Sequence, residues 1–428
     1  MISIKPFKAL LYSQDKIRDF SEVVCPPYDV ISPTQQDYFH KLNPYNFIHL
    51  LLGKDIPDEN KYKRAGILFS DWIKNKIFIQ DDKPSIYFYS QQYNIKGETK
   101  TRLGFIALLG LGGKDSSVFG HEHTRLEAKE DRFKLIKKVH ANLSPIFIVS
   151  KDKKRIIQRV FDLYIQGTLP IIEVKDKDNT LHKLWRIDSP QVLEMIQSGM
   201  QKEDAFIADG HHRYEVSLAY RDFMKEKYPD RFKEDSSLNY TLAYFTNTDL
   251  RGLSILPIHR LLKLDKTLDL NKFILRLKEH FDVEEIKDKT RFFFLMQKGG
   301  RAEHLLGMYK DRRFYLLRLK NIRILDKLIA DKPKEYRTLD VSMLNHIIFK
   351  DILGYDSMSK NSLKYSPSAE EFITLADSDP LNIAFFLNPV KMQQIIDVAL
   401  NGNKMPAKST YFYPKVLSGL VINKHEEL

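Results

Sequence analysis

Apolar positions recur at helical spacing or in short runs along most of the chain, and the first part predicts both kinds of element. Residues 61–77 carry apolar side chains at helical spacing and predict a helix. The runs SIYFYSQQYNI and TRLGFIALLGL, separated by KGET, predict a β-hairpin. A polar loop, VVCPPYDVISP, precedes them, in which Pro26 and Pro27 favour extended backbone and the Asp29 carboxylate is suited to capping a turn or helix that follows.

The middle of the chain predicts strands and helices in alternation. After the break at Gly112 and Gly113, the charged run from Glu127 to Val139 predicts a helix, and PIFIVS predicts a buried strand. A strand pair around LPIIEVKDKDNTLHKLWRI and a helix over QVLEMIQSGM come next. DAFIA then predicts a short strand, YEVSLAYRDFMKEKYP a helix ended by Pro229, and LNYTLAYFTN another strand.

The last part predicts the hairpin LLGMYKDRRFYLLRL and a long helix, LDVSMLNHIIFKDILG, closed by Gly354 in a left-handed cap. AFFLNPV, a helix around 391–401 and KMPAKSTYFYPKVLSGLVI follow. Because strands and helices interleave without a regular βαβ rhythm, we expect an α+β fold with mixed sheets. A chain of 428 residues is too long for one core, and the breaks suggest three parts, 1–112, 113–262 and 263–428.

Composition fits a globular protein of a reducing compartment. Hydrophobic residues make up 43% and charged residues 29% of the chain, an ordinary globular mixture. We find no run of about 18 apolar residues that would span a membrane, and the opening residues are too polar for a secretory signal. The single cysteine, Cys25, excludes an internal disulfide, so the expected location is the cytoplasm.

The net charge of +12 favours anionic partners such as nucleotides or nucleic acid. The basic residues are dispersed, however, and there is no basic tail, no helix-turn-helix with a basic recognition helix and no basic stripe interleaved with aromatic residues. A solvated basic surface is therefore favoured over a dedicated nucleic-acid face.

The stretch FIADGHHRYE, residues 206–215, concentrates chemistry at the predicted start of a helix. A strand, a sharp turn at Gly210 and a helix near Tyr214 would direct backbone N–H groups at one point, and Arg213 would add a bidentate fork for phosphate. His211 and His212 are suited to hydrogen bonding or proton shuttling. Asp209 is suited to binding magnesium, to fixing a histidine tautomer, or simply to capping the helix.

The segment GHEHT, residues 120–124, places Glu122 between His121 and His123. A glutamate beside an anion site is suited to the role of general base, although a His-Glu-His triplet in a loop is equally compatible with solvation. Arg125 stands where the second histidine of an HExxH zinc motif would be. If this segment met DGHHR in space, four histidines and two carboxylates would gather, which keeps a metal site as an alternative.

Two further segments are candidates for the same site. In CPPYDV, Tyr28 and Asp29 are positioned either to reach the pocket or to form a proline-stiffened turn. KSTYFYPK offers hydroxyl and lysine side chains for phosphate or carboxylate, but its alternating aromatic residues also fit a plain strand. Its candidate residues are Lys408, Ser409, Thr410 and Lys415.

Seven motifs in the same order identify a family resemblance. They are KPFKAL, VVCPPYDVI, GHEHT, NLSPIF, FIADGHHRYE, ILPIHRLL and MPAKSTYFYPK. Together they resemble the prokaryotic proteins grouped as domain-of-unknown-function family 1015, over essentially the whole chain. A weaker resemblance, to the ParB/sulfiredoxin-like superfamily and its strand–GxHR–helix phosphate-binding element, implies a phosphate-binding core over residues 113–262.

Within that superfamily, the free-serine kinases resemble this chain in two places, the His-Glu pair and the DGHHR-type turn. The resemblance implies that Glu122 activates a substrate hydroxyl and that the DGHHR residues hold the phosphates of ADP or ATP, with or without magnesium. Those kinases are much shorter, and no serine-binding residue is identifiable here. The candidate catalytic residues are Glu122, His121, Asp209 and His211. The candidate phosphate-binding residues are Gly210, His212, Arg213, Lys408, Ser409 and Thr410, with Tyr28, Asp29 and His123 near the substrate and Asp209 as a candidate magnesium ligand.

These observations predict a phosphotransferase that acts on a nucleotide and a small hydroxyl metabolite. One alternative is a phosphatase for small phosphoesters of the phosphoserine type, with or without a histidine-bound metal that activates water. The other is a ParB-like, nucleotide-dependent DNA-binding or regulatory module, whose retention on DNA would fall steeply with salt.

Overall fold

The computed structural model describes residues 1–112, 116–248, 251–299, 303–355 and 362–426. Gly113, part of the predicted break, lies outside the described residues. The chain divides into two compact units. Unit 1 contains Met1–Gly120, Thr124–Leu253 and Pro414–Leu428, and unit 2 contains His121–His123 and Ser254–Tyr413. The mixture of helices and several sheets confirms the α+β class.

Unit 1 is built on a mixed nine-stranded sheet of order β6-β11-β8-β12-β5-β4-β10-β9, with β1 paired to β5. The strands β6 and β11 are parallel, as are β8 and β12, and the other neighbours are antiparallel. The strands are β1 (Ile4–Lys5), β4 (Ile86–Ile95), β5 (Glu98–Gly110), β6 (Val118–Gly120), β8 (Ile146–Ser150), β9 (Ile172–Lys175), β10 (Leu181–Ile187), β11 (Ala205–Asp209) and β12 (Tyr240–Asn247).

The hairpin predicted from two alternating runs is formed by β4 and β5. These two strands lie in the middle of the sheet. Because β5 also pairs with β12, residues before 112 and after 113 share one sheet. The sequence suggests three parts. The contacts of the folded chain group the first part and most of the second, without residues 121–123 and 254–262, in one unit with the last fifteen residues (Pro414–Leu428).

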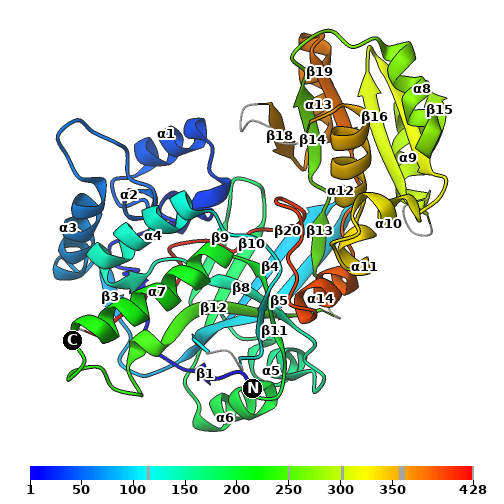
Figure 1. The fold of residues 1–428 in the computed structure, drawn as a ribbon. Coiled ribbons are helices and arrows are strands. Elements are labelled where there is room, and N and C mark those ends of the chain that lie inside the picture. The colour runs from blue at the N-terminus through cyan, green and yellow to red at the C-terminus, as the bar shows by residue number, and fades with distance from the viewer. Residues whose placement is uncertain (113–115, 249–250, 300–302, 356–361, 427–428) are drawn as a thin grey trace. The chain divides into compact units, whose positions relative to one another are not determined.

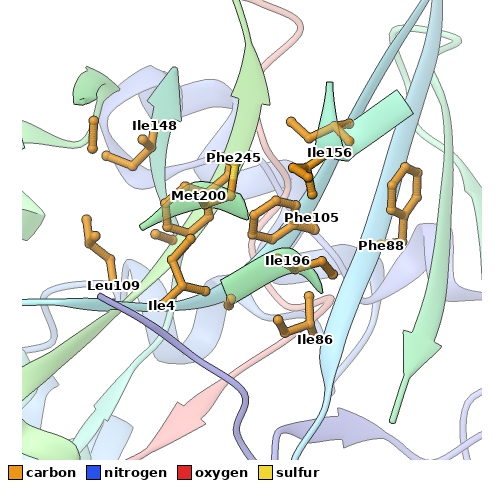
Figure 2. Packing of buried hydrophobic residues seen from close by; sticks show 14 of the residues in the cluster. Ile4, Ile86, Phe88, Phe105, Leu109, Ile148, Ile156, Ile196, Met200 and Phe245 are labelled. Atoms are coloured by element: carbon orange, nitrogen blue, oxygen red, sulfur yellow. The ribbon is translucent and has the colours of Figure 1, made fainter. Parts of the chain in front are cut away.

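One face of this sheet is apolar and is covered by α5 (Ile156–Val160) and α6 (Pro190–Met200). Figure 2 shows side chains from alternate positions of the strands packing against the two helices, Phe105 and Phe245 among them. Alternation of side chains along each strand places the remaining residues on the opposite face. This second face carries the buried polar groups described below.

The remaining elements of unit 1 form a helical cover around α7 and a second apolar cluster near the N-terminus. In Figure 1, α4 and α7 run side by side, in agreement with their contacts. The helices are α1 (Pro33–Leu42), α2 (Ile48–Leu51), α3 (Lys61–Lys74), α4 (Leu126–Val139) and α7 (His211–Lys227). The short strand pairs are β2 (Leu10–Tyr12) with β3 (Phe78–Gln80), and β7 (Ala141–Asn142) with β21 (Asn423–Lys424).

Unit 2 contains a six-stranded antiparallel sheet of order β15-β17-β16-β19-β14-β18 and a separate strand pair, β13 with β20. The strands are β13 (Ser254–Leu256), β14 (His259–Lys263), β15 (Phe281–Ile286), β16 (Leu305–Lys310), β17 (Arg313–Leu319), β18 (Leu363–Ser366), β19 (Asn382–Phe386) and β20 (Tyr411–Tyr413). The helices are α8 (Leu270–His280), α9 (Lys289–Gly299), α10 (Ile324–Leu328), α11 (Lys334–Arg337), α12 (Asp340–Met343), α13 (Ala369–Ser378) and α14 (Met392–Leu400).

Two predictions of local structure need correction. The single helix expected over LDVSMLNHIIFKDILG is α12 followed by a π-helical stretch, Leu344–Ile352, although Gly354 does follow it in the left-handed conformation with a φ of 78°. Asp29 does not cap α1, because it lies inside a short 3-10 helix, Tyr28–Val30. The cap of α1 is Ser32, whose hydroxyl accepts from the Gln35 N–H in a capping box.

None of the helices in the described part of the chain combines the length and apolar character needed to cross a membrane.

The apolar face of the unit 1 sheet predicts that a leucine buried in it and an exposed leucine contribute differently to the free energy of unfolding. Leu109 is fully buried in the cluster of Figure 2, whereas Leu169 is 92% exposed. We expect Leu109→Ala to lower the free energy of unfolding by about 2–5 kcal/mol, because it leaves a cavity in a packed core. Leu169→Ala should change it by less than about 0.5 kcal/mol. Urea unfolding measures both, and equal losses would contradict the assigned core.

Candidate functional site

The predicted strand–turn–helix element is present in unit 1. The strand β11 ends at Asp209 and α7 begins at His211, three residues earlier than expected, with Gly210 as its N-cap. Gly210 has a φ of 91°, a conformation that L side chains rarely adopt. A Cβ atom there would also lie 2.9 Å from Cζ of Arg213. Glycine is therefore required both for the turn and for the position of Arg213.

Two cationic side chains converge on Asp209 at the end of β11. The Arg213 guanidinium donates to Oδ2 and the Lys415 ammonium donates to Oδ1, each at 2.5 Å. Arg213 also donates to the backbone carbonyl of Pro145. All three charged side chains are about nine-tenths buried, with exposed fractions of 11–12%. The predicted helix-capping role of Asp209 is not observed, since α7 has no side-chain cap.

The ionisation of Asp209 follows from this arrangement. Burial alone would raise the pKa of its carboxyl group, but the charges of Lys415 and Arg213, together with the Lys415 hydrogen bond and a contribution from His211, hold that pKa well below its usual range. Asp209 is therefore an anion at every physiological pH. It fixes both cations in one geometry, and the group of three carries a net positive charge.

Arg213 also lines a small cavity of about 50 Å³ between α4, α7 and the segment after α4. Arg132 and Tyr28 line it as well, and the Arg132 guanidinium lies 4.2 Å from the centre of the Tyr28 ring. Burial, supported by the charge of Asp29, raises the pKa of Tyr28 to about 12. The phenol is therefore a neutral hydrogen-bond donor at neutral pH. Tyr28 thus lines the same cavity as Arg213 of the DGHHR element.

The polar side chains of this cavity are Asn142, Ser144, Ser217 and Thr241, in addition to Tyr28 and the two arginines. A volume of 50 Å³ holds about three water molecules. That volume is far below the roughly 300 Å³ of a pocket for a complete small-molecule ligand. The cavity has room for one small anionic group.

The first turn of α7 is tied to the start of α4. His212 accepts, through Nε2, a hydrogen bond from the backbone N–H of Arg125 at 2.9 Å. Glu215 accepts from the Thr124 hydroxyl at 2.6 Å and from the Lys129 ammonium at 3.1 Å. The hydrogen bond to Nε2 assigns a neutral tautomer to His212, protonated on Nδ1. His212 therefore has a structural partner that its phosphate-binding prediction did not include.

The backbone around Lys415 is hydrogen-bonded to a buried polar network on the second face of the sheet. Gln91 donates to the carbonyl of Lys415 at 2.8 Å, and Arg102 donates to the carbonyl of Pro414 at 2.6 Å. Arg102 is fully buried, donates to the Gln91 side-chain carbonyl and lies 4.5 Å from the centre of the Phe147 ring. Both carbonyls next to the Lys415 side chain are thereby fixed, which orients its ammonium group toward Asp209.

The residues of GHEHT are divided between the two units. His121, Glu122 and His123 belong to unit 2, whereas Thr124 belongs to unit 1. The Thr410 hydroxyl donates to Glu122 Oε1 at 3.2 Å and lies 3.1 Å from Nε2 of His121. Because that hydroxyl has only one hydrogen, His121 is assigned the tautomer that donates from Nε2.

Other predicted residues of unit 2 have different surroundings. His121 is fully buried, Glu122 is half-buried and His123 is exposed. The Ser409 hydroxyl donates to the carbonyl of Pro406, and Lys408 is exposed with a positive φ of 57°. The predicted phosphate ligands Lys408, Ser409 and Thr410 thus lie in unit 2, whereas Lys415 of the same motif lies in unit 1 with DGHHR.

The described residues contain no group of three or more histidine, cysteine, aspartate or glutamate side chains that could hold a metal ion. Each oxygen of Asp209 accepts from a cationic side chain. A magnesium ion at this carboxylate would have to displace those cations, so the residues present do not fit Asp209 as a magnesium ligand.

Two residues of the site were weakly signalled in the sequence. Lys415 was included with the KSTYFYPK candidates, but its partner Asp209 is 206 residues away and no local pattern joins them. Arg132 lies within the charged run of α4, where arginine usually faces solvent, yet its side chain is only 8% exposed. The signal for Arg132 was its place in the apolar repeat of that helix, beside Leu135, Ile136 and Val139.

The chain matches one family of proteins over most of its length. A model described as "Protein of unknown function (DUF1015)" matches residues 4–342. The chain belongs to this family. The match includes GHEHT and DGHHR, and MPAKSTYFYPK lies beyond it. No curated protein matches the chain.

Solved structures resemble the chain weakly. A conserved hypothetical protein from Pyrococcus furiosus is 14% identical with a TM-score of 0.33, covering 73% of this chain and 92% of its own. A free serine kinase in complex with AMP is 12% identical with a TM-score of 0.36, covering 75% and 91%. A mutant free serine kinase in complex with ADP is 10% identical with a TM-score of 0.36, covering 75% and 92%.

The buried charges predict a specific acid response. We expect Asp209→Asn to lower the free energy of unfolding at pH 7 by about 3–5 kcal/mol, because it leaves the charges of Arg213 and Lys415 buried without their anion. The folded-state pKa of Asp209 is depressed, so its contribution is fully present above the unfolded value of about 3.9 and is lost as pH falls below it. The stability gap between parent and variant should therefore narrow below about pH 4.

Urea unfolding at pH 7 and pH 3 measures this gap. Asp222→Asn is the matched control on the same helix, because Asp222 is 64% exposed and pairs with its neighbour in sequence, Arg221. That substitution should cost at most about 1 kcal/mol. A gap for Asp209→Asn that is equally large at both pH values would show that Asp209 is not an ionised, buried partner of the two cations.

Proposed function

We propose that this protein transfers a phosphoryl group between a nucleotide and a small hydroxyl compound, and that the β11–α7 turn binds the phosphate. The observation that carries the proposal is the pair of buried cations fixed on Asp209 at the start of a helix. Phosphoryl transfer needs positioned positive charge more than covalent participation by the protein. Because these cations are already held in place, binding a phosphate does not carry the entropic cost of ordering their side chains.

Three features of unit 1 support phosphate as the ligand. The turn directs the first backbone N–H groups of α7 beyond the helix end, where anions are favoured. Arg213 presents a guanidinium, a planar donor suited to phosphate oxygens. The cavity beside it has room for one small anionic group and is lined by a second guanidinium and a neutral phenol. A nucleotide would therefore engage this site through its phosphates alone.

Glu122 is the proposed general base. It takes the proton of the acceptor hydroxyl as that oxygen forms a bond to the transferred phosphorus, and the bond from phosphorus to the nucleotide's bridging oxygen breaks with its electron pair. Within unit 2, the hydrogen bond from Thr410 fixes one oxygen of Glu122. His121, which donates to the same hydroxyl, keeps that hydroxyl pointed toward the carboxylate. ADP or ATP is the proposed nucleotide, and serine the first acceptor to test.

Binding of ADP tests the phosphate assignment. We expect Arg213→Ala to weaken the Kd for ADP about tenfold to a hundredfold, since a hydrogen bond to a charged group contributes roughly 1.5–3 kcal/mol. Arg159→Ala is the control, because Arg159 is exposed and should leave the Kd unchanged. Calorimetry measures both, with circular dichroism to verify the fold. If ADP binds to Arg213→Ala as tightly as to the parent, the phosphate assignment is wrong.

Turnover tests the role of Glu122 separately. Glu122→Gln keeps the size of the side chain and its ability to accept from Thr410, but it removes the proton acceptor. We expect kcat to fall by about 10²–10⁴ with the Kd for ADP unchanged. Steady-state assays with ATP and serine, and calorimetry with ADP, measure the two quantities. A kcat within about twofold of the parent would exclude Glu122 as the base.

A further inference from the structure

Two histidines of unit 1 face each other outside the site described above. His40 lies in the last turn of α1 and His49 lies in α2. Their Nδ1 atoms are 3.1 Å apart, and the ring planes are nearly perpendicular, at 88°. Each opposite ring nitrogen lies against a backbone carbonyl. His40 Nε2 is 3.0 Å from the oxygen of Leu52, and His49 Nε2 is 3.3 Å from the oxygen of Asn43.

Counting hydrogens shows what this geometry requires. A carbonyl oxygen cannot donate, so each Nε2 must carry the hydrogen of its contact. A neutral imidazole has only one N–H, and both are then used at the carbonyls. The two Nδ1 atoms, 3.1 Å apart, then both offer lone pairs. A positive centre shared by the two nitrogens, either a third proton or a metal ion, stabilises such a contact.

The distance and the outer contacts match a pair of metal ligands. Two imidazole nitrogens at 2.0–2.1 Å from a zinc ion would be about 3.1–3.4 Å apart at angles between roughly 98° and 109°. Histidines that bind metals almost always donate their other ring N–H to a carbonyl or carboxylate, which fixes the ring and its tautomer. Both His40 and His49 have that outer contact.

The scaffold holds the two rings rigidly while leaving them accessible. Phe39, Ile48 and Leu50 anchor both helices in the second apolar cluster. The connecting loop is fixed by Asn46, whose side chain donates to the carbonyl of Glu22 and accepts from the N–H of Ile48. Both histidines are only half-buried, so an ion has a path from solvent.

We propose that His40 and His49 form a two-histidine site for a divalent transition-metal ion such as Zn²⁺ or Cu²⁺, which joins α1 to α2. The Nδ1 atoms are the two protein ligands, and water completes the coordination. Imidazole suits Zn²⁺, Cu²⁺ and Ni²⁺, whereas Mg²⁺ prefers oxygen ligands. The site is independent of the proposed phosphoryl transfer. A metal ion bound there would stabilise the packing of α1 and α2 in unit 1.

Metal binding to the full chain tests this proposal. Equilibrium dialysis with ZnCl₂ at pH 7.5 should show one bound ion per chain that is lost, with Kd at least about tenfold weaker, in His40→Gln and in His49→Gln. Zn²⁺ should raise the Tm of the parent but not that of either variant, since a ligand that binds only the folded state stabilises it. His304→Gln, a histidine of unit 2, is the control and should bind Zn²⁺ as the parent does.

Spectroscopy with Cu²⁺ provides a readout that does not depend on stability. The electron paramagnetic resonance spectrum of one equivalent of Cu²⁺ should show coupling to two imidazole nitrogens in the parent and to one in each variant. If the parent binds no metal, the proposal is overturned, and nitrogen NMR of its histidines then shows whether the two rings share an imidazolium or a hydrogen bond between neutral rings. Equal Zn²⁺ binding by parent and both variants would also overturn it.

Discussion

The contact of Asp209 with Arg213 and Lys415 is the constraint on which the rest of unit 1 depends. It joins the end of β11 and the adjacent first turn of α7 to the segment that carries Lys415, 206 residues after Asp209. Because the three side chains are about nine-tenths buried, none of the charges is tolerable without the others. The turn at Gly210 brings Arg213 back toward Asp209, and the sheet supplies the surface on which Lys415 arrives.

The segment after residue 413 is correspondingly well anchored in unit 1. Gln91 and Arg102 hold the carbonyls beside Lys415, Ser418 pairs with Cys25 in a backbone bridge, and Asn423 lies in β21 against β7. Burying a guanidinium such as that of Arg102 carries a desolvation cost, which its hydrogen bonds to Gln91 and Pro414 and its ring contacts offset. The polar side chains on the second face of the sheet thus fix the backbone around Lys415 and thereby position its ammonium group.

The sequence predicts the local parts of this arrangement and not the distant ones. The alternation in β4 and β5 and the turn at Gly210 are set by neighbouring residues, so the hairpin and the strand–turn–helix element were predictable. Lys415 and Arg132 reach the site through tertiary packing, which no spacing along the chain encodes. The contacts of His212 and Ser409 with nearby backbone groups compete with the ligand roles assigned to them from residue type alone. The roles of Glu122 and Arg213 in chemistry remain predictions.

Phosphorus NMR of the purified protein with magnesium and ATP, in the presence and absence of L-serine, tests the central claim most directly. Nucleotide-dependent appearance of a phosphomonoester signal, with ADP formed in equal amount, is the result that the account predicts. A parallel sample of O-phosphoserine should release no inorganic phosphate in the absence of nucleotide. Release of phosphate without nucleotide, or bound nucleotide with no transfer to any small hydroxyl compound, would contradict phosphoryl transfer and leave the Asp209 cluster as a structural or binding element.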